Sequence, residues 1–408
     1  MKLRRGIFLV CSLLLVGFAT LTPGGRDSRS ALAGNFWCVA CDPLAGADIV
    51  VNTLLFIPLG AALALFSESI LVVLVAALMS AAIETLQHYA MPAGRDANIT
   101  DVLSNTFGAF IGTQLSWRWR AWLLPDQRRA RALATAGACG AILALVWTAW
   151  ALGRDVSPTA FEQSAMPFTP GFGWYHGFVH NARIRGVDYA HRGDGPLILQ
   201  GALAARESLS VLIEHHDERR ELVPALYLHH LNDTLPELII GQSGADARIR
   251  VALRAQRWRL ASLELVLRSA FVDRQDVRTI NAVIAPEDWN LASVQGSVTT
   301  QAQLPLTLGL GWALLQHAVA LENSAAPLVL WAWFLVLFAP VGYWCAMTGR
   351  GAWAFVVGAA LSIGAVLFVV PGMAALSPTS SIEWIDAAVG FVVGVGCGTL
   401  VERRRFAV

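Results

Sequence analysis

Charged residues are scarce in this chain, and their scarcity narrows the class of protein. They make up 14% of the 408 residues, against 55% hydrophobic residues, whereas soluble domains hold about 25% charged residues. The formal net charge is only +1, and no basic stretch with interleaved aromatic residues occurs outside the loops between apolar runs. These features exclude a general nucleic-acid-binding surface and indicate a polytopic membrane protein.

Common enzyme motifs are also missing. The chain contains no Walker loop, no G-x-G-x-x-G at a strand–helix turn, no H-E-x-x-H and no G-x-S-x-G elbow. We therefore expect neither nucleotide-driven transport nor a bound cofactor or metal.

Cysteines are few, six in all. Two of them, Cys38 and Cys41 in the sequence WCVAC, lie between apolar runs, where oxidation is possible. They form either a small disulfide or a redox pair, and we favour the disulfide because nothing nearby resembles a thioredoxin βαβ unit. The other four lie in apolar runs as small apolar residues: Cys11, Cys139, Cys345 and Cys397.

Eight apolar runs are long enough to cross a membrane as helices. The first follows MKLRR and is predicted to be an uncleaved helix rather than a signal peptide, with ALAG at 31–34 as the alternative cleavage site. Tryptophans stand at several run ends, as is typical of membrane–water interfaces. The runs lie at about 6–21, 48–66, 70–90, 101–117, 132–152, 326–347, 351–374 and 382–401.

The distribution of arginine and lysine predicts the orientation. With both termini in the cytoplasm, the short cytoplasmic loops and ends hold most of these residues, as the positive-inside rule requires. The polar region 153–305 then lies outside the cytoplasm. The apolar stretch 304–321 would invert everything after it if it crossed the membrane, so we interpret it as the end of the polar domain or as an interfacial segment.

The region 153–305 is predicted to be an antiparallel β sandwich inserted between a membrane domain at 1–152 and another at 306–408. Short runs rich in β-forming residues are separated by Gly, Asn and Asp clusters. The runs lie at 208–215, 224–230, 237–242, 247–255 and 257–267. Their rhythm and the DWN at 288–290 weakly resemble the concanavalin-like lectin/laminin-G jelly roll, a resemblance that implies carbohydrate binding. We expect no metal site at the histidine pairs 215–216 and 229–230, because adjacent residues in a strand point to opposite faces and no third ligand stands at a suitable spacing.

A group of polar residues in the first membrane domain is the candidate functional site. Carboxylates inside membrane segments cost about 2.5–3.5 kcal/mol on insertion scales, so they have a partner or a task. The i,i+4 pairs 48/52, 84/88 and 101/105 each share one helix face, and the predicted topology brings all of them to the outer interface. We expect them to converge between three helices, as a ligand site or as a structural polar cluster. The residues are Asp48, Asn52, Glu84, Gln87, His88, Arg95, Asp101 and Asn105.

The order and spacing of these residues resemble the VanZ-like membrane protein family. The pattern is D-x-x-x-N-x-x-L-F-x-P-x-G, then E-x-x-Q, then R, then D-V-x-x-N-x-x-G-x-x-x-G, over about 48–115. The resemblance implies a bacterial envelope protein in the inner membrane, and its namesake is associated with glycopeptide antibiotic resistance. The 153–305 domain lies outside the family pattern, so resistance is not carried over.

The last membrane domain contains a possible degenerate repeat of this unit. LFAPVGY at 337–343 matches LFIPLGA at 55–61, and WIDAAVGFVVGVGCG aligns Asp386, Gly394 and Gly398 with Asp101, Gly108 and Gly112. Chance similarity between apolar segments is the alternative. If the repeat is real, one copy kept the polar site and the other kept the scaffold.

Three functional hypotheses follow, with binding ahead of catalysis. The first is a binding or accessory protein for a surface glycan, a lipid-linked saccharide or a glycopeptide, alongside polysaccharide-synthesis proteins of the envelope. The second is a membrane enzyme acting on a lipid-linked phosphate or sugar, with Glu84 or Asp101 as general base and Arg95 holding a phosphate. The third is a transporter that uses the carboxylates for proton coupling.

Overall fold

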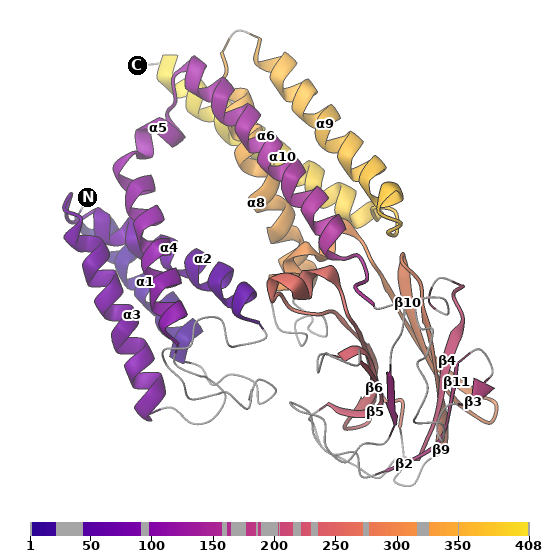
Figure 1. Cartoon of the computed structure of the whole chain (residues 1–408). Helices are drawn as coiled ribbons and strands as arrows, with labels where there is room; N and C mark the ends of the chain where they lie inside the picture. Colours follow the sequence, from indigo (N-terminus) through magenta and orange to yellow (C-terminus); the bar gives the residue numbers. More distant parts are fainter. Residues whose placement is uncertain are drawn as a thin grey trace. The chain divides into compact units, whose positions relative to one another are not determined.

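The structure is a computed structural model of the chain (Figure 1). It divides into two compact units, which are described separately. Several predictions lie outside the described residues: Arg95, the pair Cys38 and Cys41, and the histidines of the strand pairs other than His229. The described residues are 2–21, 44–90, 98–156, 161–164, 177–184, 187–188, 203, 205–214, 222–229, 236–271, 277–315, 326–349 and 351–406.

The first unit is helical and comprises 1–136, 343–356 and 395–408. Four long helices form its body: α1 (Lys2–Leu21), α2 (Ala45–Ala64), α3 (Leu71–Ala90) and α4 (Ile99–Trp117). The short α5 (Trp119–Leu123) and the start of α6 (Gln127–Ala151) follow. A buried core from all four long helices holds them together: Val16, Phe56, Leu59, Ala76 and Ala109.

Helices α2 and α4 pack at backbone contact because glycines occupy the interface. A Cβ atom added to Gly108 would lie 2.1 Å from the carbonyl oxygen of Thr53, and one added to Gly112 would lie 2.0 Å from that of Ile57. In the opposite direction, a Cβ atom on Gly60 would lie 2.1 Å from the carbonyl oxygen of Ala109. Small residues permit this close approach of membrane helices, and here they bring the polar ends of α2 and α4 together.

The second unit contains the β domain with the adjoining parts of four membrane helices, and comprises 137–342 and 357–394. The four helices are α6, α8 (Ala326–Ala346), α9 (Ala352–Met373) and α10 (Ser381–Phe406). Counted over both units, the described part of the chain contains seven helices that are long and apolar enough to cross a membrane. They correspond to seven of the eight predicted spans. The eighth, α4, is a helix of 19 residues that falls short in apolar character because it carries Asp101, Asn105 and Gln114.

The β domain is an antiparallel sandwich of a five-stranded and a six-stranded sheet, as predicted. The strand orders are β1-β5-β6-β7-β8 and β11-β10-β9-β4-β2-β3. Burial alternates along β4, β9 and β10, which places one face of the larger sheet in the core. Trp289, the centre of the DWN sequence, is fully buried there. The strands are β1 (Phe161–Ser164), β2 (Phe178–Ile184), β3 (Val187–Asp188), β4 (Ser208–Glu214), β5 (Val223–His229), β6 (Pro236–Ser243), β7 (Asp246–Val251), β8 (Glu264–Leu267), β9 (Val277–Ile284), β10 (Asp288–Gln295) and β11 (Val298–Pro305).

Two predicted segments differ in detail from the structure. The run 257–267 is not one strand, because the 3₁₀ helix η2 (Arg254–Trp258) occupies its start and only β8 follows. The apolar stretch after β11 forms the eight-residue 3₁₀ helix η3 (Leu308–Leu315), most of which is buried. A crossing helix needs about 20 residues, so the eight residues of η3 are too few to cross a membrane. The rest of the predicted stretch, 316–321, lies outside the described residues.

Candidate functional site

The described members of the polar group come from three helices of the first unit. Asp48 lies in the first turn of α2 and Asn52 one turn later. Glu84, Gln87 and His88 lie in the last two turns of α3. Asp101 and Asn105 lie in the first two turns of α4. These positions place all seven at one end of the three helices.

Three of these side chains form a buried layer and join the helices by hydrogen bonds. Glu84, Gln87 and Asn105 are 3%, 6% and 1% exposed. Gln87 Nε2 donates to the carbonyl oxygen of Thr20 at 2.7 Å, which ties α3 to α1. Asn105 Nδ2 donates to Ser80 Oγ at 2.9 Å and ties α4 to α3. Buried polar groups with such partners stabilise a unique helix arrangement.

Glu84 fixes the start of α4. Its Oε2 atom accepts a hydrogen bond from the backbone N–H of Asn98 at 3.1 Å. The side chain of Asn98 is the N-cap of α4 and accepts from the N–H of Thr100 at 2.9 Å. An N-cap bond of this kind stabilises a helix by about 1 kcal/mol. The buried carboxylate therefore positions the turn that presents Asp101.

Three other side chains form a half-exposed layer. Asp48, Asn52 and Asp101 are each intermediate in exposure. Asn52 Nδ2 donates to Asp101 Oδ1 at 2.8 Å, a bond between α2 and α4. Both carboxylates lie in first turns, where the partial positive charge of a helix N-terminus stabilises an anion. This layer presents carboxylate and amide oxygens to the surface of the unit.

His88 does not join either layer. Its side chain is exposed, and its ring makes an edge contact with Tyr89 at a centroid distance of 4.8 Å. Although i,i+4 spacing places it on the same helix face as Glu84, it lies nearer the end of α3. Within the described residues, no group of three or more His, Cys, Asp or Glu side chains is placed to hold a metal ion.

One buried acceptor of the cluster has no hydrogen bond. Asn105 Oδ1 is buried and lacks a partner among the described residues, while its amide nitrogen bonds Ser80. The sequence reasoning overlooked Ser80, because a single serine in an apolar helix carries no distinctive signal. Asn98 precedes Asp101 in the sequence N-I-T-D, a pattern that indicates a helix N-terminus, and the structure makes it the N-cap of α4.

The last membrane helices repeat the close packing of α2 and α4. A Cβ atom on Gly394 would lie 2.0 Å from the carbonyl oxygen of Ala339, and one on Gly390 would lie 3.1 Å from the Cα atom of Leu335. Adding one and the same number to the residues of the pair Gly112 and Ile57 gives Gly394 and Ala339. Adding that number to the pair Gly108 and Thr53 gives Gly390 and Leu335. The packing thus aligns Gly390 and Gly394 with Gly108 and Gly112, one turn away from the alignment by sequence.

In this packing register position 383 corresponds to position 101, whereas the alignment by sequence pairs Asp386 with Asp101. Glu383 is 2% exposed and lies at the start of α10 in a capping box, since its Oε2 accepts from the N–H of Ser380 at 2.7 Å. Its Oε1 accepts from Thr307 Oγ1 at 2.5 Å and from the N–H of Gly309 at 2.7 Å. The positions of Asp48 and Asn52 are taken by Leu330 and Phe334. The carboxylate of Glu383 is therefore hydrogen-bonded by the chain itself.

Comparison with protein families matches residues 8–120 to the family described as VanZ/LLP1. The match includes every described residue of the polar group and confirms the resemblance for this part of the chain. Neither the search of curated proteins nor the search of solved structures gave a match.

Proposed function

We propose that the half-exposed layer of polar side chains binds a hydroxyl-rich ligand. The layer belongs to residues 8–120, the VanZ-like unit of a multi-pass membrane protein. The ligand class is the saccharide of a surface glycan, a lipid-linked saccharide or a glycopeptide. The observation that carries the proposal is the juxtaposition of Asp48, Asn52 and Asp101 at partial exposure above a fully buried layer. An ionised carboxylate offers about four acceptor sites, and sugar hydroxyls are matching donors.

The second half of the chain supports the proposal that neutral hydroxyl groups donate hydrogen bonds to these carboxylates. Glu383, which takes the place of Asp101 there, accepts one hydroxyl and one backbone N–H from the segment that covers it. A carboxylate at this helix position thus pairs with neutral donors. The first copy, with Asp101 half exposed rather than buried, is the one open to an external donor.

Binding is favoured over catalysis by the state of Glu84. A general base must reach the proton that it removes, yet Glu84 is almost wholly buried and accepts a hydrogen bond from the start of α4. The position of Glu84 suits a structural role, in which it holds the start of α4 beside the half-exposed layer. We accordingly assign an accessory binding role, with the β sandwich as a second saccharide-binding module outside the membrane and both termini in the cytoplasm of a bacterial cell. Polysaccharide-synthesis proteins of the envelope are the proposed partners.

A binding assay tests this function. The full chain in nanodiscs is titrated with soluble oligosaccharides and with polyprenyl-phosphate-linked sugars, and the variants Asn52→Ala and Asp101→Asn are compared with Asp126→Asn. Loss of one or two hydrogen bonds predicts affinities about tenfold lower for the first two variants. Asp126 is an exposed carboxylate that caps α6 through the N–H of Arg129, so its variant controls for a change of charge. Equal affinity in all three variants, or no binding of any saccharide, contradicts the proposal.

A further inference from the structure

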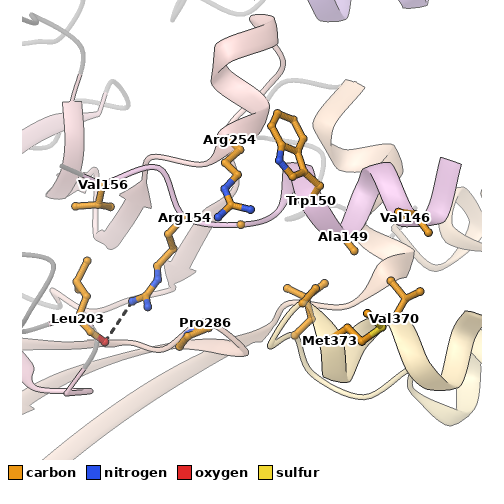
Figure 2. A pocket seen from close by; sticks show the side chains of 13 residues that line it. Val146, Ala149, Trp150, Arg154, Val156, Leu203, Arg254, Pro286, Val370 and Met373 are labelled. Atoms are coloured by element: carbon orange, nitrogen blue, oxygen red, sulfur yellow. Dashed lines mark hydrogen bonds between the residues drawn. The ribbon is translucent and has the colours of Figure 1, made fainter. Parts of the chain in front are cut away.

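A cavity in the second unit lies where membrane helices meet the β domain, and none of its residues belongs to the polar site described above. Its volume is about 550 Å³, within the usual range for small-molecule sites. One part of its wall comes from the last turns of α6 and α9, and the other from the linker after α6 and from the β domain (Figure 2).

The helical wall is apolar. Val146, Ala149 and Trp150 come from α6, and Val370 and Met373 come from α9. Both helices are long and apolar enough to cross a membrane, and both end at this cavity. Trp150 and Met373 are 37% and 83% exposed, which suits side chains at a bilayer boundary. This side of the cavity is therefore continuous with the lipid-facing surface of the helices.

The opposite wall carries two arginines that extend into the cavity (Figure 2). Arg154 is held in place, since its Nη1 atom donates to the carbonyl oxygens of Ile284 at 3.1 Å and Leu203 at 3.3 Å. Arg254 passes over Gly153, where a Cβ atom would lie 3.0 Å from its Nη1 atom. The absence of a side chain at Gly153 lets this guanidinium reach the cavity.

Within the part of the chain that the structure describes, these two arginines lack the ion pair that their neighbours form. Close by, Arg257 pairs with Asp155 and Arg206 pairs with Glu287. Among the described residues, no carboxylate lies within ion-pairing distance of Arg154 or Arg254. Burial lowers the pKa of Arg154, and the more distant charge of Glu287 raises it, but a guanidinium remains protonated at neutral pH. Two guanidinium groups without an ion-pair partner in the described part of the chain thus face an otherwise apolar cavity.

We propose that this cavity binds the phosphate head group of an anionic membrane lipid. Arg154 and Arg254 contact the phosphate oxygens, and the first carbons of the acyl chains lie against α6 and α9. Guanidinium groups form paired, charge-assisted hydrogen bonds with phosphate, and the apolar wall matches the acyl chains. A free phosphate leaves the helical wall bare, whereas a lipid fills both walls. This inference does not depend on the saccharide site.

The test compares lipids on the full chain. Protein in detergent is titrated with phosphatidylglycerol, with phosphatidylcholine and with inorganic phosphate, and bound lipid is counted by native mass spectrometry. We expect phosphatidylglycerol to bind about tenfold more tightly than phosphatidylcholine, the ratio given by one added charge-assisted contact. Inorganic phosphate at millimolar concentration is expected not to displace it.

Variants distinguish the cavity from general surface attraction. Arg254→Gln removes a cavity charge whose side chain forms no hydrogen bond to the described part of the fold, and we expect about a fivefold loss of phosphatidylglycerol affinity. Arg259→Gln removes the same charge from an exposed position outside the cavity and is expected to bind normally. Equal losses in both variants indicate surface attraction only and overturn the proposal. Displacement by inorganic phosphate, or equal binding of the two lipids, also overturns it.

Discussion

Replacement of Gly112 by alanine is expected to lower the free energy of unfolding by about 3 kcal/mol, near the upper end of the range for overpacked interiors. The added Cβ atom would lie 2.0 Å from the carbonyl oxygen of Ile57 and 2.8 Å from the backbone nitrogen of Ala61. Both neighbours are backbone atoms of α2, so no side-chain rotation relieves the clash, and the two helices must separate. Separation also lengthens the hydrogen bond between Asn52 and Asp101, so saccharide affinity is expected to fall together with stability.

The matched control is Gly17→Ala in α1. Apart from its own helix, no described atom lies within 4 Å of the position of its Cβ atom, and alanine is favoured over glycine in a helix interior by about 1 kcal/mol. Unfolding of the full chain in mixed micelles, followed by tryptophan fluorescence, measures both variants. If Gly112→Ala unfolds at the same denaturant concentration as the unmodified chain, the proposed backbone contact between α2 and α4 is wrong.

Replacement of Glu383 by alanine is the second change with a large expected effect, a loss of about 3–5 kcal/mol in the stability of the second unit. The carboxylate accepts hydrogen bonds from Thr307, Gly309 and Ser380, and each buried donor left without a partner costs about 1–3 kcal/mol. Because Thr307 and Gly309 lie in the segment that includes the start of η3, the change also weakens the attachment of this segment to α10.

Asp386→Ala provides the control for Glu383→Ala. Asp386 lies one turn further along α10 and is only half buried, so its replacement is expected to change stability by less than about 1 kcal/mol. Limited proteolysis of the full chain reports the attachment of η3 directly. Cleavage near 306–315 is expected to become faster in Glu383→Ala alone. Unchanged cleavage and stability would show that the bonds of Glu383 contribute little.

The class of protein and its larger divisions could be read from the sequence because they rest on composition and periodicity. Long apolar runs predicted the membrane helices, and alternating or β-branched runs predicted strands such as β4 and β6. The run 257–267 was the exception. Its first residues include the exposed Arg257 and Trp258 of η2, and an alternation of charged and apolar residues does not by itself distinguish a strand from a turn with a solvent-exposed face.

The polar group was found from its spacing, but its division into two layers was not predictable. Helical periodicity gives the face of a residue and not its depth, so the spacing of Glu84 and His88 alone could not show that one is buried and the other exposed. Partners on other helices, such as Ser80 and Thr20, depend on packing. Glu383 escaped notice for a related reason: Asp386 matched Asp101 by residue type, whereas the backbone contacts of Gly390 and Gly394 give a register one turn away.

Hydrogen exchange of the backbone amides tests the central claim most directly, that the half-exposed layer of the VanZ-like unit binds a saccharide. The full chain in nanodiscs is measured by mass spectrometry with and without the saccharide that binds best in the titration. The account predicts slower exchange in the first turns of α2 and α4, around Asp48 and Asp101, and unchanged exchange at the start of α10, where Glu383 is already covered. Slower exchange confined to the β sandwich, or no change in α2 and α4 at saturating saccharide, would contradict it.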